Sequence, residues 1–369
     1  MTKARTNASA TPAVGRNMVI NGAMNVAQRA TSVTGLGADG NTYNTVDRWQ
    51  LVANATAGRF TMSQTADGPN GISANCLKLD CTTADTSIAA AELLRITQKF
   101  EGQNLQRIGK GVVGAKQITL SFYVKASAVF TFGVELFDND NSRQITKLFD
   151  TTTDWVRHSF VIPADVDDGS SPFADDNALS LQLQFWLHAG ATYTSGTLNT
   201  ASWANYTQAN RAAGIDSFFS NTANNFFLTG VQMEVGPVAS EFEQEEITTT
   251  TTKCRRYYTK IVAGSQYGIF GGSGFCYTTD DAFIAIDLNP EMRAPPALDH
   301  GDLSKVLIHR ANGSGIAIAT MTLPTNTLNT RVATVAANDV TGDVLVAGDS
   351  TNLLANNDAT AYLAFSAEL

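Results

Sequence analysis

The sequence predicts an all-β protein with two β-sandwich domains, joined by a short connector that we expect to be helical. Hydrophobic residues make up 43% of the 369 residues and charged residues only 16%. The sequence is instead rich in Thr, Ser, Asn, Ala and Gly, a mixture that favours short strands joined by polar turns. Short segments that alternate apolar and polar residues recur along the chain, as expected of strands that bury one face. The length suits two domains.

Strand patterns of the first domain begin after residue 17. In 117–127, Ile118, Leu120, Phe122 and Val124 fall on one face of the expected strand. In 179–190 the leucines and Phe185 face one way, while Trp186 faces the other. The segment 89–100 fits either a short helix or a strand. The remaining strand patterns of this domain lie at 76–79, 129–138, 154–163 and 224–235.

The first domain is expected to end at Gly236-Pro237, which terminates the last strand. We therefore predict a docking arm at 1–16, a first domain at 17–240, a connector at 241–260 and a second domain at 261–369. The connector is acidic first and basic last, the order that a helix dipole prefers, although five consecutive threonines disfavour a helix. Strand patterns of the second domain lie at 281–288, 305–310, 315–323, 331–339, 343–348 and 361–369.

Three motifs stand in order along the chain: NMVINGAMNVAQRATS at 17–32 with YNTVDRW at 43–49, TGVQMEVGPVASEFE at 229–243, and CRRYY at 254–258. Together they resemble a family of bacteriophage tail fibre or virion appendage proteins, whose opening INGxF…WQRGTS…YTADRW leads into a carbohydrate-binding-module-like jelly roll. In this chain Ala27 replaces the tryptophan of WQRG and Arg255 replaces the glutamine of CQRYY.

The resemblance implies a jelly-roll first domain and a structural protein of the virion, assembled in the host cytoplasm. Its expected partners are other virion proteins, two further copies in a homotrimer, and a glycan on the host cell surface. The alternative is a capsid decoration protein or head fibre with a structural role, because the N-terminal arm is short for an attachment domain.

Several function classes are not expected. The net charge is −9 and there is no basic stripe, which argues against nucleic-acid binding. No apolar run is long enough for membrane insertion. The motifs of zinc proteases, phosphate-binding loops and serine hydrolases are absent, so we expect no enzyme activity. A carboxylate pair that hydrolyses polysaccharide stays open, because the sequence does not give the separation of acids.

Aromatic residues among amides and hydroxyls are the sequence signal for sugar binding, since such rings stack on pyranose faces. Tyr193, Trp203 and Tyr206 lie in a long insertion after the 179–190 strand, and Trp186 points away from the apolar face of that strand. We predict these four as ligand-binding residues. The alternative is that Trp203 and Tyr206 cover one end of the sandwich.

The acidic loop at 163–177 is the expected metal site, with Asp165, Asp167 and Asp168 as ligands. Calcium takes several oxygen ligands from such loops, and the resemblance to jelly-roll modules also implies a structural calcium. The alternative is a solvated polar turn. The four histidines, His188 among them, are scattered in the sequence, so we do not expect them to bind a metal.

Two further roles follow from position along the chain. Tyr257 and Tyr258, next to the connector, are expected to contact other copies in the trimer. Lys3, Arg5 and Arg16 are expected to dock the N-terminal arm on the virion. The four cysteines are expected to behave as small hydrophobic residues, because no signal peptide precedes them; the alternative is a disulfide between Cys254 and Cys276.

Overall fold

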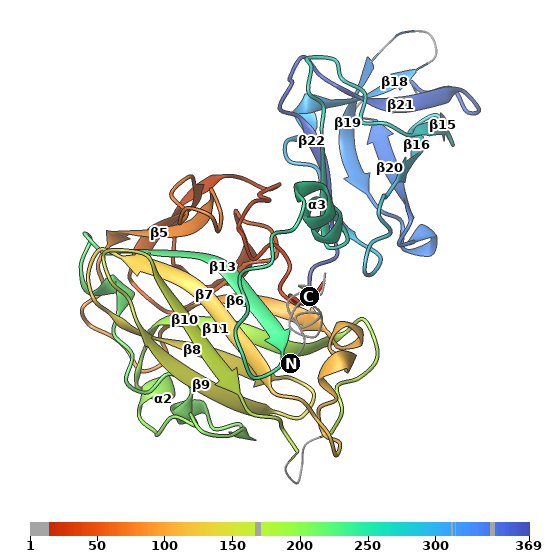
Figure 1. The fold of residues 1–369 in the computed structure, drawn as a ribbon. Coiled ribbons are helices and arrows are strands. Elements are labelled where there is room, and N and C mark those ends of the chain that lie inside the picture. The colour runs from red at the N-terminus through yellow and green to blue at the C-terminus, as the bar shows by residue number, and fades with distance from the viewer. Residues whose placement is uncertain (1–14, 167–170, 311–312, 314, 340–343) are drawn as a thin grey trace. The chain divides into compact units, whose positions relative to one another are not determined.

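The computed structural model describes residues 15–166, 171–310, 313, 315–339 and 344–369 (Figure 1). The chain divides into two compact units, residues 1–250 with Leu369, and residues 251–368. Both are built almost entirely from antiparallel strands, so the predicted all-β class is confirmed. No helix among the described residues is long and apolar enough to span a membrane.

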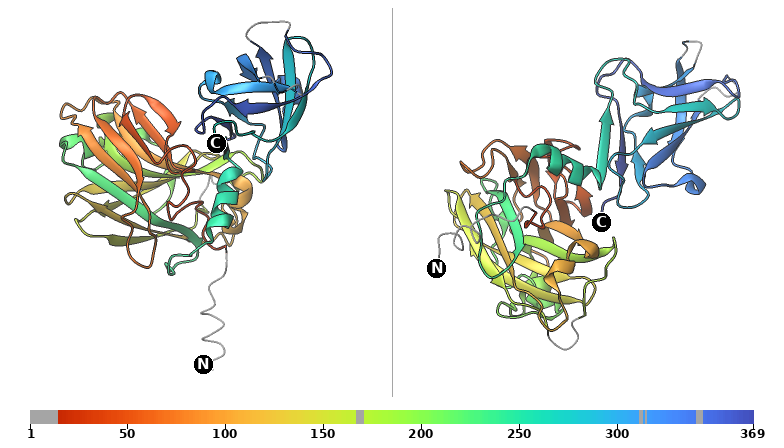
Figure 2. Two further views of the ribbon diagram at one scale, coloured as in Figure 1. Left: turned by 90° about the horizontal axis from the view of Figure 1, so that it is seen from above. Right: turned by 45° about the vertical axis from the view of Figure 1, so that its right-hand side comes forward.

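The N-terminal unit consists of two antiparallel sheets (Figures 1 and 2). The six-stranded sheet has the order β1 (Ser32–Leu36), β4 (Arg59–Thr65), β5 (Cys76–Thr83), β13 (Asn225–Val235), β7 (Ile118–Ala126), β10 (Val156–Ile162). The seven-stranded sheet has the order β12 (Ala204–Asn205), β9 (Arg143–Asp150), β8 (Thr131–Asp138), β11 (Leu179–Ala189), β6 (Leu93–Glu101), β3 (Gln50–Asn54), β2 (Gly40–Tyr43). The ambiguous segment 89–100 is thus mostly strand.

Helical segments are short throughout the described chain. The α-helices are α2 (Ala191–Thr194) and α3 (Ile247–Arg255). Single 3-10 turns are η1 (Gly102–Asn104), η2 (Gln106–Ile108), η3 (Gln208–Asn210), η4 (Phe218–Ser220), η5 (Leu303–Lys305) and η6 (Thr325–Thr327).

The core of the N-terminal unit lies between its two sheets. Phe122 on β7 meets Phe185 on β11 edge-to-face, with ring centroids 5.0 Å apart, and meets Phe149 on β9 at 5.1 Å. All three rings are buried in one continuous apolar cluster. Edge-to-face pairs contribute about 0.5–1.5 kcal/mol beyond their buried area. The apolar face that alternation assigns to 117–127 and 179–190 is therefore the face that joins the sheets.

The family-like motifs at the two ends of this unit bind each other. The side chain of Asn17 donates to the Val231 carbonyl and accepts from the Met233 amide, and its own amide donates to Glu243. Gly22 lies so close to the Val231 carbonyl that any Cβ there would overlap it. The opening motif is therefore held along β13 by hydrogen bonds, and its residues stabilise the fold of the N-terminal unit.

The loop within the opening motif is held by Asn21, which adopts a left-handed φ of 58° that asparagine tolerates better than most residues. Its side chain accepts from the amides of Asn25 and Val26 and donates to the carbonyls of Val26 and Asp47. The Gln28 amide donates to the Asp47 carboxylate at 2.9 Å. Most buried polar groups here are paired, as stability requires.

Of the expected docking residues, the structure describes only Arg16. Arg16 donates to the Glu241 carbonyl at 2.6 Å and lies 3.6 Å from the Glu234 carboxylate, so it contacts its own unit. Docking of Arg16 on another virion protein stays a prediction. Lys3 and Arg5 lie outside the described residues.

The five threonines at 248–252 form most of helix α3, so the expected helical connector is confirmed. Glu245 precedes the helix, and its carboxylate accepts from the Thr250 hydroxyl. Lys253 and Arg255 lie in the last turn, where the helix dipole favours positive charge. Charge placement thus supports a helix that β-branched residues alone would not favour.

The C-terminal unit forms a closed barrel with a small sheet, which is more closed than the expected sandwich. The barrel contains β15 (Ser273–Cys276), β16 (Asp281–Asp287), β20 (Val332–Asp339), β19 (Gly315–Thr322), β18 (Val306–Arg310) and β21 (Ser350–Ala355). The small sheet has the order β14 (Tyr258–Val262), β22 (Tyr362–Ser366), β17 (Ala297–Asp299). Closure pairs both edges of the barrel sheet, so no edge is left for another chain.

Tyr257 and Tyr258, expected at a trimer contact, are both buried within the chain. The Tyr257 carbonyl accepts from the Ala367 amide, and Tyr258 pairs with Ser366 in the sheet. The prediction that these rings meet a second copy is therefore wrong, because neither ring is exposed. Both residues therefore stabilise the small sheet formed by β14, β22 and β17.

All four cysteines are free and buried, as expected. Burial raises the pKa of Cys76 to about 12 and also raises the pKa of Cys81 and of Cys276. Because the thiolate is the reactive species, we expect no reaction of the folded protein with an aromatic disulfide reagent at pH 8. After denaturation all four thiols should react. A thiol that reacts at once in the folded protein would contradict the burial described.

Candidate functional site

A row of polar side chains crosses the seven-stranded sheet on the face away from the core. The inward positions of these strands, such as Ile96 and Phe185, belong to the apolar cluster between the sheets. Since side chains alternate along a strand, their neighbours point outward. The cross-strand pairs place these outward residues in one line, in the order Gln50, Thr97, Gln184, Glu135, Thr146. All five are buried.

Residues 190–217, here called the covering segment, pack on this outer face. Tyr193, Ala212 and Ile215 of the covering segment join Trp186 in a separate apolar cluster. Backbone hydrogen bonds fasten the segment at several points, including Thr192 to Ala90 and Asp216 to Thr131. Helix α2, at the start of the segment, lies against η3 and the end of β11 (Figure 1). The insertion is therefore an ordered layer over the sheet.

An ion pair joins the sheet to the covering segment. Glu135 accepts from Arg211 Nε at 3.0 Å and Nη2 at 2.8 Å, and from Trp186 Nε1 at 2.8 Å. Arg211 also donates to Gln184 at 3.0 Å. Burial opposes the charge on Arg211, but Glu135 outweighs burial and raises the pKa of Arg211. Both charged groups are thus fixed in place.

Arg95, on β6, adds a second guanidinium beside this pair. Its guanidinium carbon lies 5.0 Å from the centre of the Trp186 ring, and Arg211 lies 4.9 Å from the same ring. Burial, followed by repulsion from Arg211, lowers the pKa of Arg95 to about 10. Its Nε and Nη1 are buried without a hydrogen-bond partner in the described chain. The cluster therefore contains two guanidinium groups and one carboxylate, and two nitrogens of Arg95 have no hydrogen-bond acceptor in the described chain.

The exposed part of the site, here called the aromatic rim, consists of Tyr206 and Phe137 next to Arg211. Tyr206 is 41% exposed and packs edge-on against Phe137, with ring centroids 5.6 Å apart. The Arg211 guanidinium contacts both rings, with its carbon 5.1 Å from the centre of the Phe137 ring and 5.6 Å from the centre of the Tyr206 ring. Gln182, half-buried, is the register partner of Phe137. An exposed ring on a rigid base, with an amide beside it, can stack on a sugar and bond its hydroxyls.

The structure brings together three of the four predicted ligand residues. Tyr193 lies 5.4 Å from Trp186, and Tyr206 shares Arg211 with it. The inference that Trp186 is exposed is wrong, because the covering segment reduces its exposure to 0%. Sequence reasoning missed Arg95, Glu135 and Arg211. The signal for the first two is their outward position on strands.

Comparison with known proteins gives the following. No protein-family model and no curated protein matches the chain. Among solved structures, the chain is similar to the enzymatically active domain of tailspike protein 4 of bacteriophage CBA120, with 11% identity and a TM-score of 0.31 over 60% of this chain and 21% of that chain.

Two carbohydrate-binding modules are also similar in structure. They are TmCBM61, solved with β-1,4-galactotriose (8% identity, TM-score 0.29, 60% of this chain and 99% of that one), and the family 11 module of Clostridium thermocellum, solved with a mixed-linked tetrasaccharide (10%, 0.27, 57% and 98%). The chain spans only 21% of the tailspike domain. At these TM-scores the likeness places the chain in no family.

Trp203, the fourth predicted ligand residue, lies in a different cluster. It is 5% exposed and donates from its indole to the Pro163 carbonyl. Its own carbonyl accepts from Arg143. The expectation that it offers an exposed ring is therefore wrong, whereas the alternative that it covers one end of the sandwich agrees with its burial.

The same cluster accounts for Asp165, the described member of the expected calcium site. Arg143 donates to both of its oxygens at 2.7 Å, and Lys110 lies 3.5 Å away. Lys110 also lies 2.6 Å from Asp138. Asp165 and Asp138 thus form ion pairs with Lys110 and Arg143, and calcium binding by this loop stays a prediction. Asp167 and Asp168 lie outside the described residues.

Replacing Asp165 with asparagine should lower the stability of the protein by about 3 kcal/mol, because it leaves a buried cation unbalanced. The midpoint of thermal unfolding should fall by roughly 10 °C. We expect the same loss in calcium and in a calcium chelator. A loss that appears only in calcium would show that Asp165 binds the ion.

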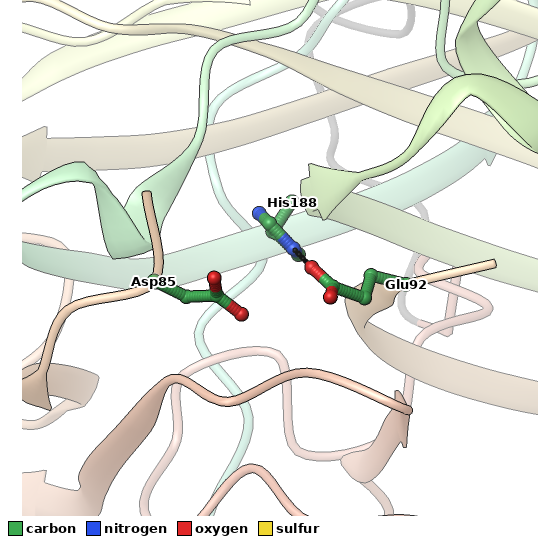
Figure 3. Close-up of side chains that lie close together, drawn as sticks. All are labelled: Asp85, Glu92 and His188. Atoms are coloured by element: carbon green, nitrogen blue, oxygen red, sulfur yellow. Dashed lines mark hydrogen bonds and ion pairs between the residues drawn. The ribbon is translucent and has the colours of Figure 1, made fainter. Parts of the chain in front are cut away.

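A third polar cluster joins two residues of the loop between β5 and β6 to one residue of β11 (Figure 3). Asp85 follows β5, Glu92 precedes β6, and His188 lies near the end of β11. Each offers one ligand atom, and these atoms all lie within 4.8 Å of one another. Burial lowers the pKa of His188 although Glu92 bonds it. Burial also opposes ionisation of Asp85, but hydrogen bonds from Ala57 and Thr56 outweigh it and lower that pKa.

Proposed function

We propose that the protein is a non-catalytic structural protein of a bacteriophage virion, a tail fibre or appendage that recognises a glycan on the host surface. Three ordered sequence motifs support the virion origin. The first and second motifs hold the two ends of the N-terminal unit together, because Asn17 forms hydrogen bonds with Glu243 and with β13. The residues of these two motifs therefore stabilise the fold. The glycan would bind on the outer face of the seven-stranded sheet.

The observation that favours this function is the exposed ring of Tyr206, held by Phe137 and Arg211 above the buried pair of Arg211 and Glu135. Sugar sites combine an aromatic platform with a few fixed polar groups. Preorganisation lowers the entropy lost on binding. Nothing in such recognition requires a covalent step.

A single rim of this size would bind a sugar weakly, so we propose that the protein works as a homotrimer. Linked sites can exceed the affinity of one site by about 10²–10⁴ when their spacing suits the surface. Assembly with other virion proteins in the host cytoplasm would then present several rims to one cell. The role would need no movement of the covering segment, because Tyr206 is exposed already.

The test is adsorption to bacterial cells. Fluorescently labelled full-length protein should bind cells of a sensitive strain and compete with phage attachment. Mild periodate oxidation, which cleaves vicinal diols of sugars, should abolish this binding, while protease treatment of the cells should not. Binding that survives periodate but is lost after protease would contradict a glycan receptor. Binding without competition would favour a role on the capsid.

A further inference from the structure

The cluster of Asp85, Glu92 and His188 has the composition of a metal site and lies apart from the aromatic rim. The three side chains converge from the loop between β5 and β6 and from the end of strand β11 (Figure 3). His188 Nε2 lies 3.2 Å from Glu92 Oε2. Two adjacent ligands on one metal ion, with bonds of about 2.1 Å, are separated by roughly this distance. A modest inward movement of Asp85 would complete a three-ligand set.

The charge of the cluster is unbalanced without a cation. Asp85 and Glu92 are 5% and 4% exposed, and His188 is fully buried. Among the described residues neither carboxylate forms an ion pair with lysine or arginine, and His188 is the sole basic group paired with Glu92. Burying two carboxylates beside one imidazole is costly unless a positive charge joins them. The Asp165 cluster, by contrast, contains two protein cations.

The surrounding groups hold the ligands in a binding orientation. His188 Nδ1 lies 2.8 Å from the Ser217 hydroxyl, which leaves Nε2 directed at Glu92. One oxygen of Asp85 accepts from the Thr56 hydroxyl at 3.0 Å and from the Ala57 amide at 2.8 Å. Metal-binding histidines and carboxylates are oriented by such outer partners.

We propose that the chain binds one divalent transition-metal ion of the zinc type through Asp85, Glu92 and His188. Imidazole with two carboxylates suits zinc, whereas calcium prefers oxygen ligands alone. The ion would join the β5–β6 loop to the end of β11, where the covering segment begins. Gly190 donates to the Glu92 carbonyl at 2.9 Å, so the ion and the covering segment share one support.

The experiment uses full-length protein stripped with a chelator and then titrated with zinc chloride by calorimetry. We expect one zinc ion per chain and a rise in the midpoint of thermal unfolding. Cobalt in place of zinc should give visible absorption bands of a site with nitrogen and oxygen ligands. Calcium and magnesium titrated in parallel should bind far more weakly.

Two variants guard against a failure to fold. Glu92→Gln keeps the shape of the side chain and removes its charge, and His188→Gln replaces the imidazole with an amide that can still hydrogen-bond. Each should weaken zinc binding by more than the roughly 10–100-fold that loss of a supporting partner costs. His300→Gln is the matched control, since His300 bonds only a neighbouring carbonyl. Absence of zinc binding by the wild-type protein, or zinc binding by both variants as tight as that of the wild type, would overturn the proposal.

Discussion

Replacing Glu135 with alanine should destabilise the N-terminal unit by about 3–5 kcal/mol, the usual cost of breaking a buried ion pair from one side. The carboxylate is fully buried and accepts hydrogen bonds from Nε and Nη2 of Arg211 and from the indole of Trp186. Without it, Arg211 would remain buried beside Arg95, whose charge already repels it. Urea unfolding, followed by tryptophan fluorescence, measures the change.

The matched control is Asp80→Ala, which breaks the exposed pair of Asp80 with Lys78 at 3.1 Å. The Asp80 side chain is 47% exposed, so the loss should lie in the range of about 0.2–1 kcal/mol. Glu135→Gln keeps a hydrogen-bond acceptor and should fall between the two. If Glu135→Ala costs no more than Asp80→Ala, the pair does not support the sheet as described.

Replacing Tyr206 with alanine should weaken glycan binding by about 2 kcal/mol, or roughly 30-fold in Kd, the loss typical of a central aromatic contact. Stability should change by less than about 1 kcal/mol, because the ring is 41% exposed and its backbone bond to Ser142 remains. The measurement is binding to immobilised surface polysaccharide that is purified from a bacterial strain whose cells bind the wild-type protein.

Tyr277→Ala is the control for this second prediction. Tyr277 is 60% exposed but lies in the C-terminal unit, so its loss should leave binding unchanged. Equal loss in both variants would point to a non-specific aromatic effect. Loss in Tyr277→Ala alone would move the site to the barrel.

The strands β5, β7, β8, β10, β11 and β13 could be predicted because their apolar and polar residues alternate, whereas β1 to β4, β9 and β12 were missed. Alternation in 179–190 correctly assigns Phe185 to the core and turns Trp186 away from it. Alternation does not reveal what covers the outward face. The covering segment shows no strand or helix alternation that marks its inner face, and its packing on Trp186 is joined to the sheet by Arg211 and Glu135, which are 76 residues apart in the sequence.

Polar pairs between residues that are distant in the sequence explain the other differences between the sequence predictions and the structure. Asp165 stands in an acidic loop that resembles a calcium site, yet its cations Lys110 and Arg143 come from distant segments. His188 stands alone in the sequence, while Asp85 and Glu92 reach it only after the strands pair. Closure of the C-terminal barrel is likewise a matter of pairing between β15 and β21, which strand patterns do not specify.

The measurement that tests the central claim most directly is an array of bacterial surface glycans probed with labelled full-length protein, beside Tyr206→Ala and Tyr277→Ala. The predicted result is that the wild-type protein and Tyr277→Ala retain the same small set of glycans, and that Tyr206→Ala loses it. Glycan binding that is unchanged in Tyr206→Ala would contradict the proposed site. No binding of any glycan by a wild-type protein that does adsorb to cells would contradict glycan recognition itself.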